Sequence, residues 1–153
     1  MTAGSRREAR ERALSLLYEA DLKEQAPADL LADLPVDPDP FVSDVVAGVG
    51  AHRAELDEVI TRFAIDWALD RMPVVDRNVL RLAVFELLHR PDTPVGAVIS
   101  EAVELAKRYS TDDSGRFVNG ELAGIAAARD RGDLAVPSTW LTVEVSYVLG
   151  ECW

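Results

Sequence analysis

The sequence predicts an all-α domain, and three observations support this prediction. Apolar residues recur at helical spacing along most of the chain. Prolines and short polar segments separate these periodic stretches, and no β-hairpin signal interrupts residues 5 to 128. The 153 residues suffice for one domain with a substantial hydrophobic core, without a metal or a disulfide to support it.

The first predicted helix covers residues 6 to 24. Its apolar stripe consists of Ala9, Ala13, Leu16, Leu17 and Ala20. Pro27 suits the first turn of a short helix that ends near Leu34. The proline-rich run at residues 35–40 then requires an extended connector, because proline disfavours helix at the residue before it.

The stretch from residue 41 to 67 is expected to hold two helices. Its apolar residues follow helical periods, but Gly48 and Gly50 weaken an unbroken helix. Residues 75–88 follow, with apolar side chains nearly all round the helix, which is typical of a central, buried helix. Glu86 falls on the apolar stripe of this helix, so we interpret it as a hydrogen-bonded structural carboxylate.

The most regular apolar stripe predicts a helix over residues 95–109, with charged residues outside it. Residues 110–114 offer side-chain caps for a last helix, which continues through Phe117, Leu122 and Ile125. The tail at residues 134–153 alternates apolar and polar residues around Val143 and is strand-like, although a single strand has no evident partner.

The charge distribution argues against nucleic-acid binding through bulk electrostatics, because the net charge is −11. A local basic segment nevertheless exists at residues 5–12, which hold four arginines. Cys152 is the only cysteine, so no internal disulfide is expected. The sequence has no predicted signal peptide and no membrane-spanning segment, so we expect a cytoplasmic protein that does not associate with membranes.

Residues with catalytic or metal-binding spacing are not evident. His52 and His89 are the only histidines, fall on different predicted helices and have no cysteine or histidine at ligand spacing. We interpret them as ordinary surface or helix-end histidines. The sequence therefore predicts no catalytic residue, no metal site and no cofactor.

Two segments are candidate RNA-binding surfaces. Arg7 and Arg10 lie along the same flank of the first helix as Tyr18, which suits phosphate contacts and base stacking. A solubilising helix end with a half-buried tyrosine is the alternative. The second segment, residues 110–120, combines a capped helix start with Arg116, Phe117 and Asn119, and its alternative is a capped loop with Phe117 in the core.

Four stretches resemble the NusB family in sequence, order and spacing. They are RREARERALSLLYEAD at residues 6–21, DRMPVVDRNVLRLAVFELL at 70–88, EAVELAKRYSTDDS at 101–114 and RFVNGEL at 116–122. The resemblance covers residues 5 to 126 approximately, and the combination of EAVELAK with FVNG is highly specific. It implies a NusB-like RNA-binding domain at 1–133 and a tail without a family counterpart at 134–153.

The resemblance implies about seven helices in two small bundles and a role in transcription antitermination and ribosomal RNA synthesis. The implied partners are boxA-type single-stranded RNA, the ribosomal small-subunit protein NusE and the transcription elongation complex; a homodimer is left open. Carried over by motif position, the implied RNA-binding residues are Arg6, Arg7, Arg10, Tyr18, Asp113, Ser114, Arg116, Phe117 and Asn119. Asp76 falls where the family places a carboxylate near the partner protein.

Glu8, Glu121 and the tail depart from the family pattern. Glu8 interrupts what is often a denser arginine cluster, and Glu121 follows FVNG where an apolar residue is common. Two alternatives stay open. One is an RNA-binding domain related to the front part of ribosomal RNA cytosine methyltransferases, although the chain lacks a catalytic part; the other is a helical adaptor that binds protein without contacting RNA.

Overall fold

The computed structural model describes residues 3–64 and 67–134, and side chains from residue 6 onward. The helices are α1 (Ala3–Leu22), α2 (Pro27–Ala32), α3 (Pro40–Ala51), α4 (Arg53–Phe63), the 3₁₀ helix η1 (Leu69–Arg71), α5 (Val74–His89), α6 (Val95–Tyr109) and α7 (Asp112–Asp130). No strand occurs within these residues, and the predicted all-α class is confirmed.

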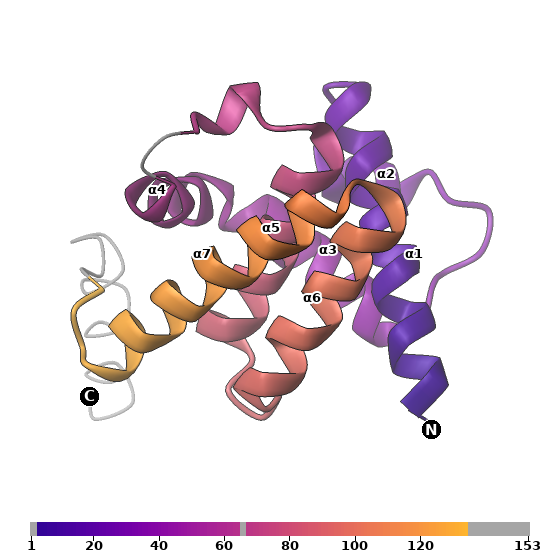
Figure 1. The fold of residues 1–153 in the computed structure, drawn as a ribbon. Coiled ribbons are helices and arrows are strands. Elements are labelled where there is room, and N and C mark those ends of the chain that lie inside the picture. The colour runs from indigo at the N-terminus through magenta and orange to yellow at the C-terminus, as the bar shows by residue number, and fades with distance from the viewer. Residues whose placement is uncertain (1–2, 65–66, 135–153) are drawn as a thin grey trace, which may run out of the picture.

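Two groups of helices share one hydrophobic core (Figure 1). The helices α1, α2 and α3 pack against one another, while α4, α6 and α7 pack around α5. Helix α5 also contacts α1 and α3, so it joins the two groups and lies at the centre of the fold. The predictions of two bundles and of a central helix near residues 75–88 are therefore confirmed, because α5 buries side chains on all sides.

The stretch at residues 40–63 forms two helices, as predicted, but the break lies at His52 and not at a glycine. Gly48 stands inside α3 for a packing reason. A Cβ atom there would lie 2.2 Å from the ring of Phe85 in α5, so only glycine permits this close approach of the two helices.

Buried ion pairs fasten α1 and α4 to the central helix. Asp21, near the end of α1, accepts hydrogen bonds from Arg77, Asn78 and Arg81 of α5. Arg81 also donates to Asp57 of α4. Burial opposes ionisation of Asp21, but the hydrogen bonds and positive charges around it lower its pKa to about 2.

The strand-like pattern of the tail lies outside the described residues. Leu134, the last described residue, is half-buried and packs against the core. Within residues 3–64 and 67–134, no helix is long and apolar enough to cross a membrane.

Candidate nucleic-acid interface

The three arginines of α1 that the sequence places on one surface lie in three different environments. Arg7 is exposed, and its guanidinium donates to both carboxylate oxygens of Glu101 in α6 at 3.1 and 2.9 Å. This hydrogen-bonded pair lowers the pKa of Glu101 and raises that of Arg7. The charge of Arg7 is therefore accessible to solvent but already balanced by a neighbouring carboxylate.

Arg10 lies inside the protein, where it donates to both oxygens of Glu86 at 3.0 and 2.9 Å. The two side chains are 8% and 2% exposed. The prediction that Arg10 shares an exposed edge with Arg7 and Tyr18 is therefore wrong, because a carboxylate of α5 draws its guanidinium inward. Glu86 is a buried, hydrogen-bonded carboxylate, as predicted.

Arg6 is half-buried beside the first aromatic residue of α3. Its guanidinium carbon lies 4.0 Å from the centre of the Phe41 ring, and that of Arg90 lies 5.0 Å from the same ring. Cation–π contact thus holds Arg6 against the domain. One of its terminal nitrogens is buried without a hydrogen-bond partner among the described residues.

A surface groove of about 340 Å³ runs beside α1. It is lined by Glu11, Leu14, Ser15, Tyr18, Val75 and Tyr109. Tyr18 is 39% exposed, as its predicted stacking role requires, and Tyr109 is 48% exposed. Glu11 accepts hydrogen bonds from Arg108 and from the hydroxyl of Tyr109 across the groove, so it balances a second surface arginine.

The predicted second segment forms the N-terminus of α7. Thr111 caps the helix, because its hydroxyl accepts a hydrogen bond from the backbone N–H of Ser114 at 3.0 Å. The hydroxyl of Ser114 is buried and donates to Oδ2 of Asp76 at 2.7 Å. Ser114 therefore faces the interior, not the solvent.

Asp76 is fully buried at the start of α5. The carboxylate that the NusB resemblance places near the partner protein is thus covered by Ser114 and the α7 N-terminus. A buried carboxylate at this point joins the first turns of α5 and α7. Its other oxygen, Oδ1, has no hydrogen-bond partner among the described residues.

The remaining predicted residues of α7 divide between solvent and core. Asp113 and Arg116 are exposed and form an ion pair with each other, and Asn119 is exposed. Phe117 is half-buried and meets Trp67 edge to face, with ring centres 4.9 Å apart. Its ring therefore belongs partly to the core, and one part of it is open to solvent.

The two predicted segments are linked through the start of α5 and the end of α6. Val75, in the groove, precedes Asp76, which accepts the hydrogen bond of Ser114 in α7. Tyr109, also in the groove, ends α6 only three residues before α7 begins at Asp112. We call the groove beside α1, together with the exposed side chain of Arg7 and the exposed side chains at the α7 N-terminus, the α1–α7 groove.

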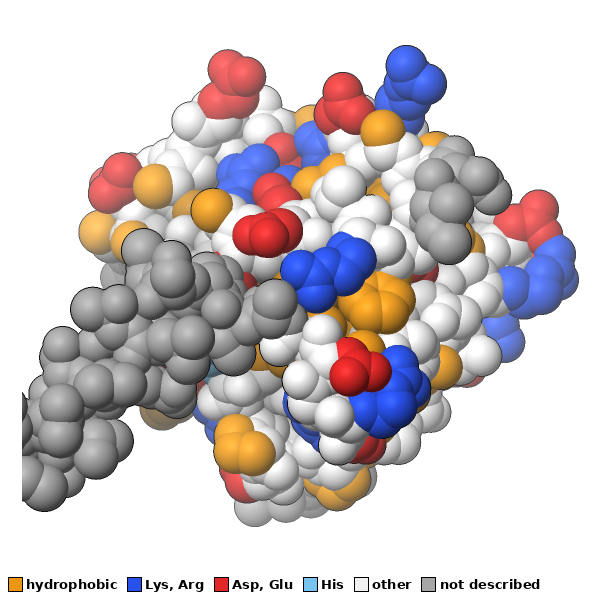
Figure 2. All heavy atoms as spheres, turned by 90° about the vertical axis from the view of Figure 1, so that its left-hand side faces the viewer, with side chains coloured by type: hydrophobic (Ala, Val, Ile, Leu, Met, Phe, Trp, Pro, Cys, Tyr) orange, Lys and Arg blue, Asp and Glu red, His pale blue; other side chains and the backbone are white. Residues whose placement is uncertain are grey.

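A second face of the molecule carries side chains of both charges. The face on the left of Figure 1 carries α4 and the end of α7. Over the part of that face that the structure describes, Figure 2 shows acidic and basic side chains interspersed, often as neighbours. This mixture agrees with the net charge of −11.

A cluster of titratable side chains went unnoticed in the sequence. His52 and His89, predicted to be unrelated, converge on Glu55. No local spacing reveals this, because α3, α4 and α5 must first pack together.

Comparison with known proteins decides the family. The model of the NusB family matches residues 7–127. The transcription antitermination protein NusB of Acidothermus cellulolyticus is 49% identical over 127 residues, which cover 80% of this chain and 88% of that protein. Its namesake in Kineococcus radiotolerans is 47% identical and covers 82% of this chain and 96% of that protein. The chain belongs to the NusB family.

Solved NusB structures have the same fold. T. maritima NusB superposes with a TM-score of 0.73 at 35% identity, over 84% of this chain and 97% of that one. A crystal structure of antitermination factors NusB and NusE in complex with dsRNA gives a TM-score of 0.72 at 30% identity, over 83% of this chain and 99% of the matched chain. The resemblance that the four sequence motifs indicated is thus confirmed.

Glu121, which departs from the NusB pattern, does not lie on the surface. It is 6% exposed, and its Oε2 atom has no hydrogen-bond partner among the described residues. Burial raises its pKa to about 7. Glu121 therefore adds no fixed charge to the α1–α7 groove, and its effect is on stability.

Proposed function

We propose that this protein is a non-enzymatic transcription antitermination factor that binds boxA-type RNA together with NusE and supports ribosomal RNA transcription in the cytoplasm. One observation carries the proposal: the groove beside α1 exposes the rings of Tyr18 and Tyr109, and the exposed Arg7 lies on the same helix as Tyr18. The similarity to a NusB that was crystallised with NusE and dsRNA supports the same partners.

Within the groove, we assign direct RNA contacts to the exposed side chains. Arg7 and Arg116 contact phosphates, Tyr18 and the open part of Phe117 stack on bases, and Asn119 offers an amide to a base edge. Each is at least partly exposed. These side chains suit single-stranded RNA, whose unstacked bases are accessible on their faces and edges.

The buried and half-buried residues of the predicted RNA-binding set hold helices and other side chains in place. Arg10 holds α1 against Glu86, and Ser114 holds the α7 N-terminus against Asp76. Arg6 is held on Phe41 and presents only part of its guanidinium, while Asp113 orients Arg116. These residues shape the α1–α7 groove without the direct phosphate contact that the motif alone implies.

The electrostatics explain why a partner protein is useful. Three arginines near the groove are paired with carboxylates: Arg7 with Glu101, Arg108 with Glu11, and Arg116 with Asp113. A phosphate has to replace a carboxylate at each pair, so the gain in Coulomb energy per contact is small. A basic partner such as a ribosomal protein adds the positive charge that this acidic chain lacks.

Fluorescence anisotropy with labelled boxA-type RNA tests the proposal. The chain is titrated alone and with equimolar NusE, against single-stranded RNA, a scrambled strand of equal composition and a duplex. We expect the single strand with the boxA sequence to bind most tightly, and NusE to increase its affinity. Equal binding of all three RNAs would contradict boxA recognition, and complex formation with NusE that leaves RNA unbound would favour a protein-binding adaptor instead.

A further inference from the structure

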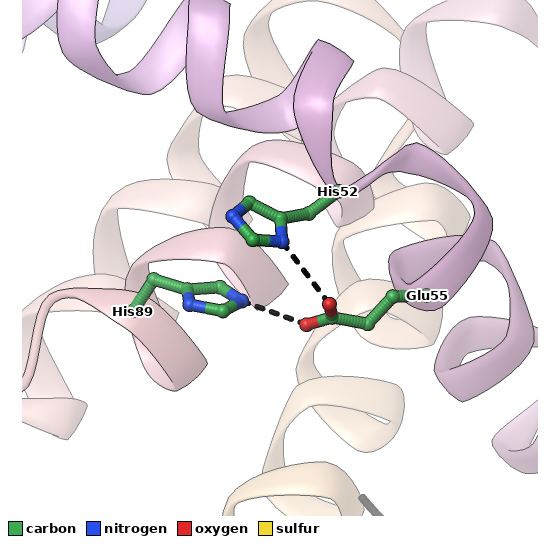
Figure 3. Close-up of side chains that lie close together, drawn as sticks. All are labelled: His52, Glu55 and His89. Carbon is green, nitrogen blue, oxygen red and sulfur yellow. Dashed lines mark hydrogen bonds and ion pairs between the residues drawn. The ribbon is translucent and has the colours of Figure 1, made fainter. Parts of the chain in front are cut away.

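The strongest site outside the α1–α7 groove is formed by His52, Glu55 and His89. His52 lies at the junction of α3 and α4, Glu55 in the first turn of α4, and His89 at the end of α5. Figure 3 shows both imidazole rings directed toward the Glu55 carboxylate. Nδ1 of His52 lies 3.1 Å from Oε2, and Nε2 of His89 lies 2.7 Å from Oε1.

The packing around the three side chains is fixed by neighbouring rings. The imidazoles of His52 and His89 stack with centres 4.1 Å apart and an interplanar angle of 23°. The ring of Phe85 stacks on His89 at 5.2 Å and lies against Gly48. The two imidazoles are thus held face to face before any ligand arrives, which lowers the entropic cost of binding a ligand.

We propose that His52, Glu55 and His89 form a binding site for a divalent transition metal ion of the Zn²⁺ class. One ligand atom from each residue lies within 4.8 Å of the other two. Zn²⁺ binds imidazole nitrogen and carboxylate oxygen at about 2.0–2.2 Å in tetrahedral geometry, so two ligand atoms of one ion lie about 3.4 Å apart. The widest pair therefore has to close by at most about 1.4 Å before all three residues bind one ion.

The chemistry of the donor set selects the metal. Two neutral imidazoles and one carboxylate suit Zn²⁺, Ni²⁺ or Co²⁺, whereas Mg²⁺ prefers oxygen ligands alone. In the metal-free arrangement the ring nitrogens that face Glu55 donate protons to its oxygens, since a carboxylate can only accept. A metal ion can bind these nitrogens only in the other tautomer of each ring, with the proton on the nitrogen that does not ligate the metal.

Burial and neighbouring charge also suit an ion. The side chain of Glu55 is 4% exposed, while those of His52 and His89 are 38% and 25% exposed. The carboxylate thus forms the floor, and the imidazoles form an edge through which an ion and a water ligand can enter. The nearby cations are already balanced, because Arg53 pairs with Asp57 and Arg90 with Asp44.

Calorimetry and thermal melting of the untagged chain with Zn²⁺ test the site. Cys152→Ser serves as the background, because Cys152 is the only thiol in the sequence. We expect one saturable Zn²⁺ site per chain, a raised Tm, and no effect of Mg²⁺ at the same concentration. With Co²⁺ in place of Zn²⁺, visible absorption bands report nitrogen and oxygen coordination directly.

Two ligand variants and one control make the test decisive. His89→Gln and Glu55→Gln should weaken Zn²⁺ binding by roughly tenfold or more. Glu58→Gln removes an exposed carboxylate one turn further along α4 and should change nothing. Since Glu55 is buried, circular dichroism checks folding, and His89→Gln carries the conclusion if Glu55→Gln unfolds. Undiminished binding by folded His89→Gln, or an equal Tm rise with Mg²⁺, would overturn the proposal.

Discussion

Arg10 of α1 and Glu86 of α5 form a two-hydrogen-bond ion pair that is almost completely buried. It lies directly behind the surface to which the NusB motifs assign RNA. Removing one member leaves the other as an uncompensated buried charge. We therefore expect Arg10→Ala to lower the free energy of unfolding by about 3–5 kcal/mol, measured by urea titration.

A double variant distinguishes this structural role from RNA contact. Arg10→Met with Glu86→Leu replaces both charges by apolar side chains and should recover most of the stability. The refolded double variant should also keep most of its RNA affinity. A stable double variant that no longer binds RNA would show that Arg10 contacts RNA after all.

Ser114→Ala should destabilise the protein by about 1–3 kcal/mol, because it leaves the buried Asp76 carboxylate without the hydrogen bond it accepts from Ser114. Ser100→Ala, which changes an exposed serine on α6, is the matched control and should be close to neutral.

Asp76→Lys should unfold the domain, since it buries an ammonium group. A folded Asp76→Lys that only loses NusE would restore Asp76 to the partner interface.

Glu121 should make stability fall as the pH rises from about 4.5 to about 7. Its folded pKa, raised to about 7, exceeds the ordinary value of 4.5, so the unfolded chain releases this proton first. The penalty is complete above pH 7 and absent below pH 4.5. Glu121→Gln should therefore stabilise the protein by about 2 kcal/mol at pH 8 and have little effect at pH 4.

Urea unfolding at both pH values measures this difference. Glu104→Gln on the exposed side of α6 removes the same charge and serves as the control. The same stability gain at pH 4 and pH 8 for Glu121→Gln would mean that its carboxyl group ionises normally in the folded protein.

Phe117 should contribute both to packing and to RNA binding, because its ring is half-buried against Trp67. Phe117→Leu keeps an apolar side chain but removes the aromatic face. We expect a small loss of Tm and a loss of RNA affinity of about 1–3 kcal/mol. RNA affinity equal to that of the parent, with Tm lowered, would assign Phe117 to the core alone.

Local pattern was sufficient to predict most of the helices. The apolar stripe predicted α6 at residues 95–109, and the proline at 27 and the connector at 35–40 correctly bracketed α2. Glu86 was recognised because it interrupts an apolar face. These features depend on neighbours three or four positions away, which the sequence displays directly.

Contacts between distant residues could not be predicted in this way. Arg10 lies beside the apolar stripe of α1, and only Glu86, 76 positions along the chain, determines that it turns inward. Local spacing also gave no sign that Ser114 covers Asp76 from another helix. His89 reaches Glu55 across 34 positions, a spacing that matches no metal-binding motif.

The salt dependence of RNA binding tests the central claim most directly, with Arg7→Ala, Glu101→Gln and the control Arg62→Ala, an arginine of comparable exposure on α4. Arg7→Ala should weaken binding of boxA-type RNA and reduce the slope of log affinity against log salt by roughly 0.7. Glu101→Gln, which releases Arg7 from its carboxylate, should strengthen binding, and Arg62→Ala should leave it unchanged. Unaltered affinity and slope for both Arg7→Ala and Glu101→Gln would contradict RNA recognition by the α1–α7 groove.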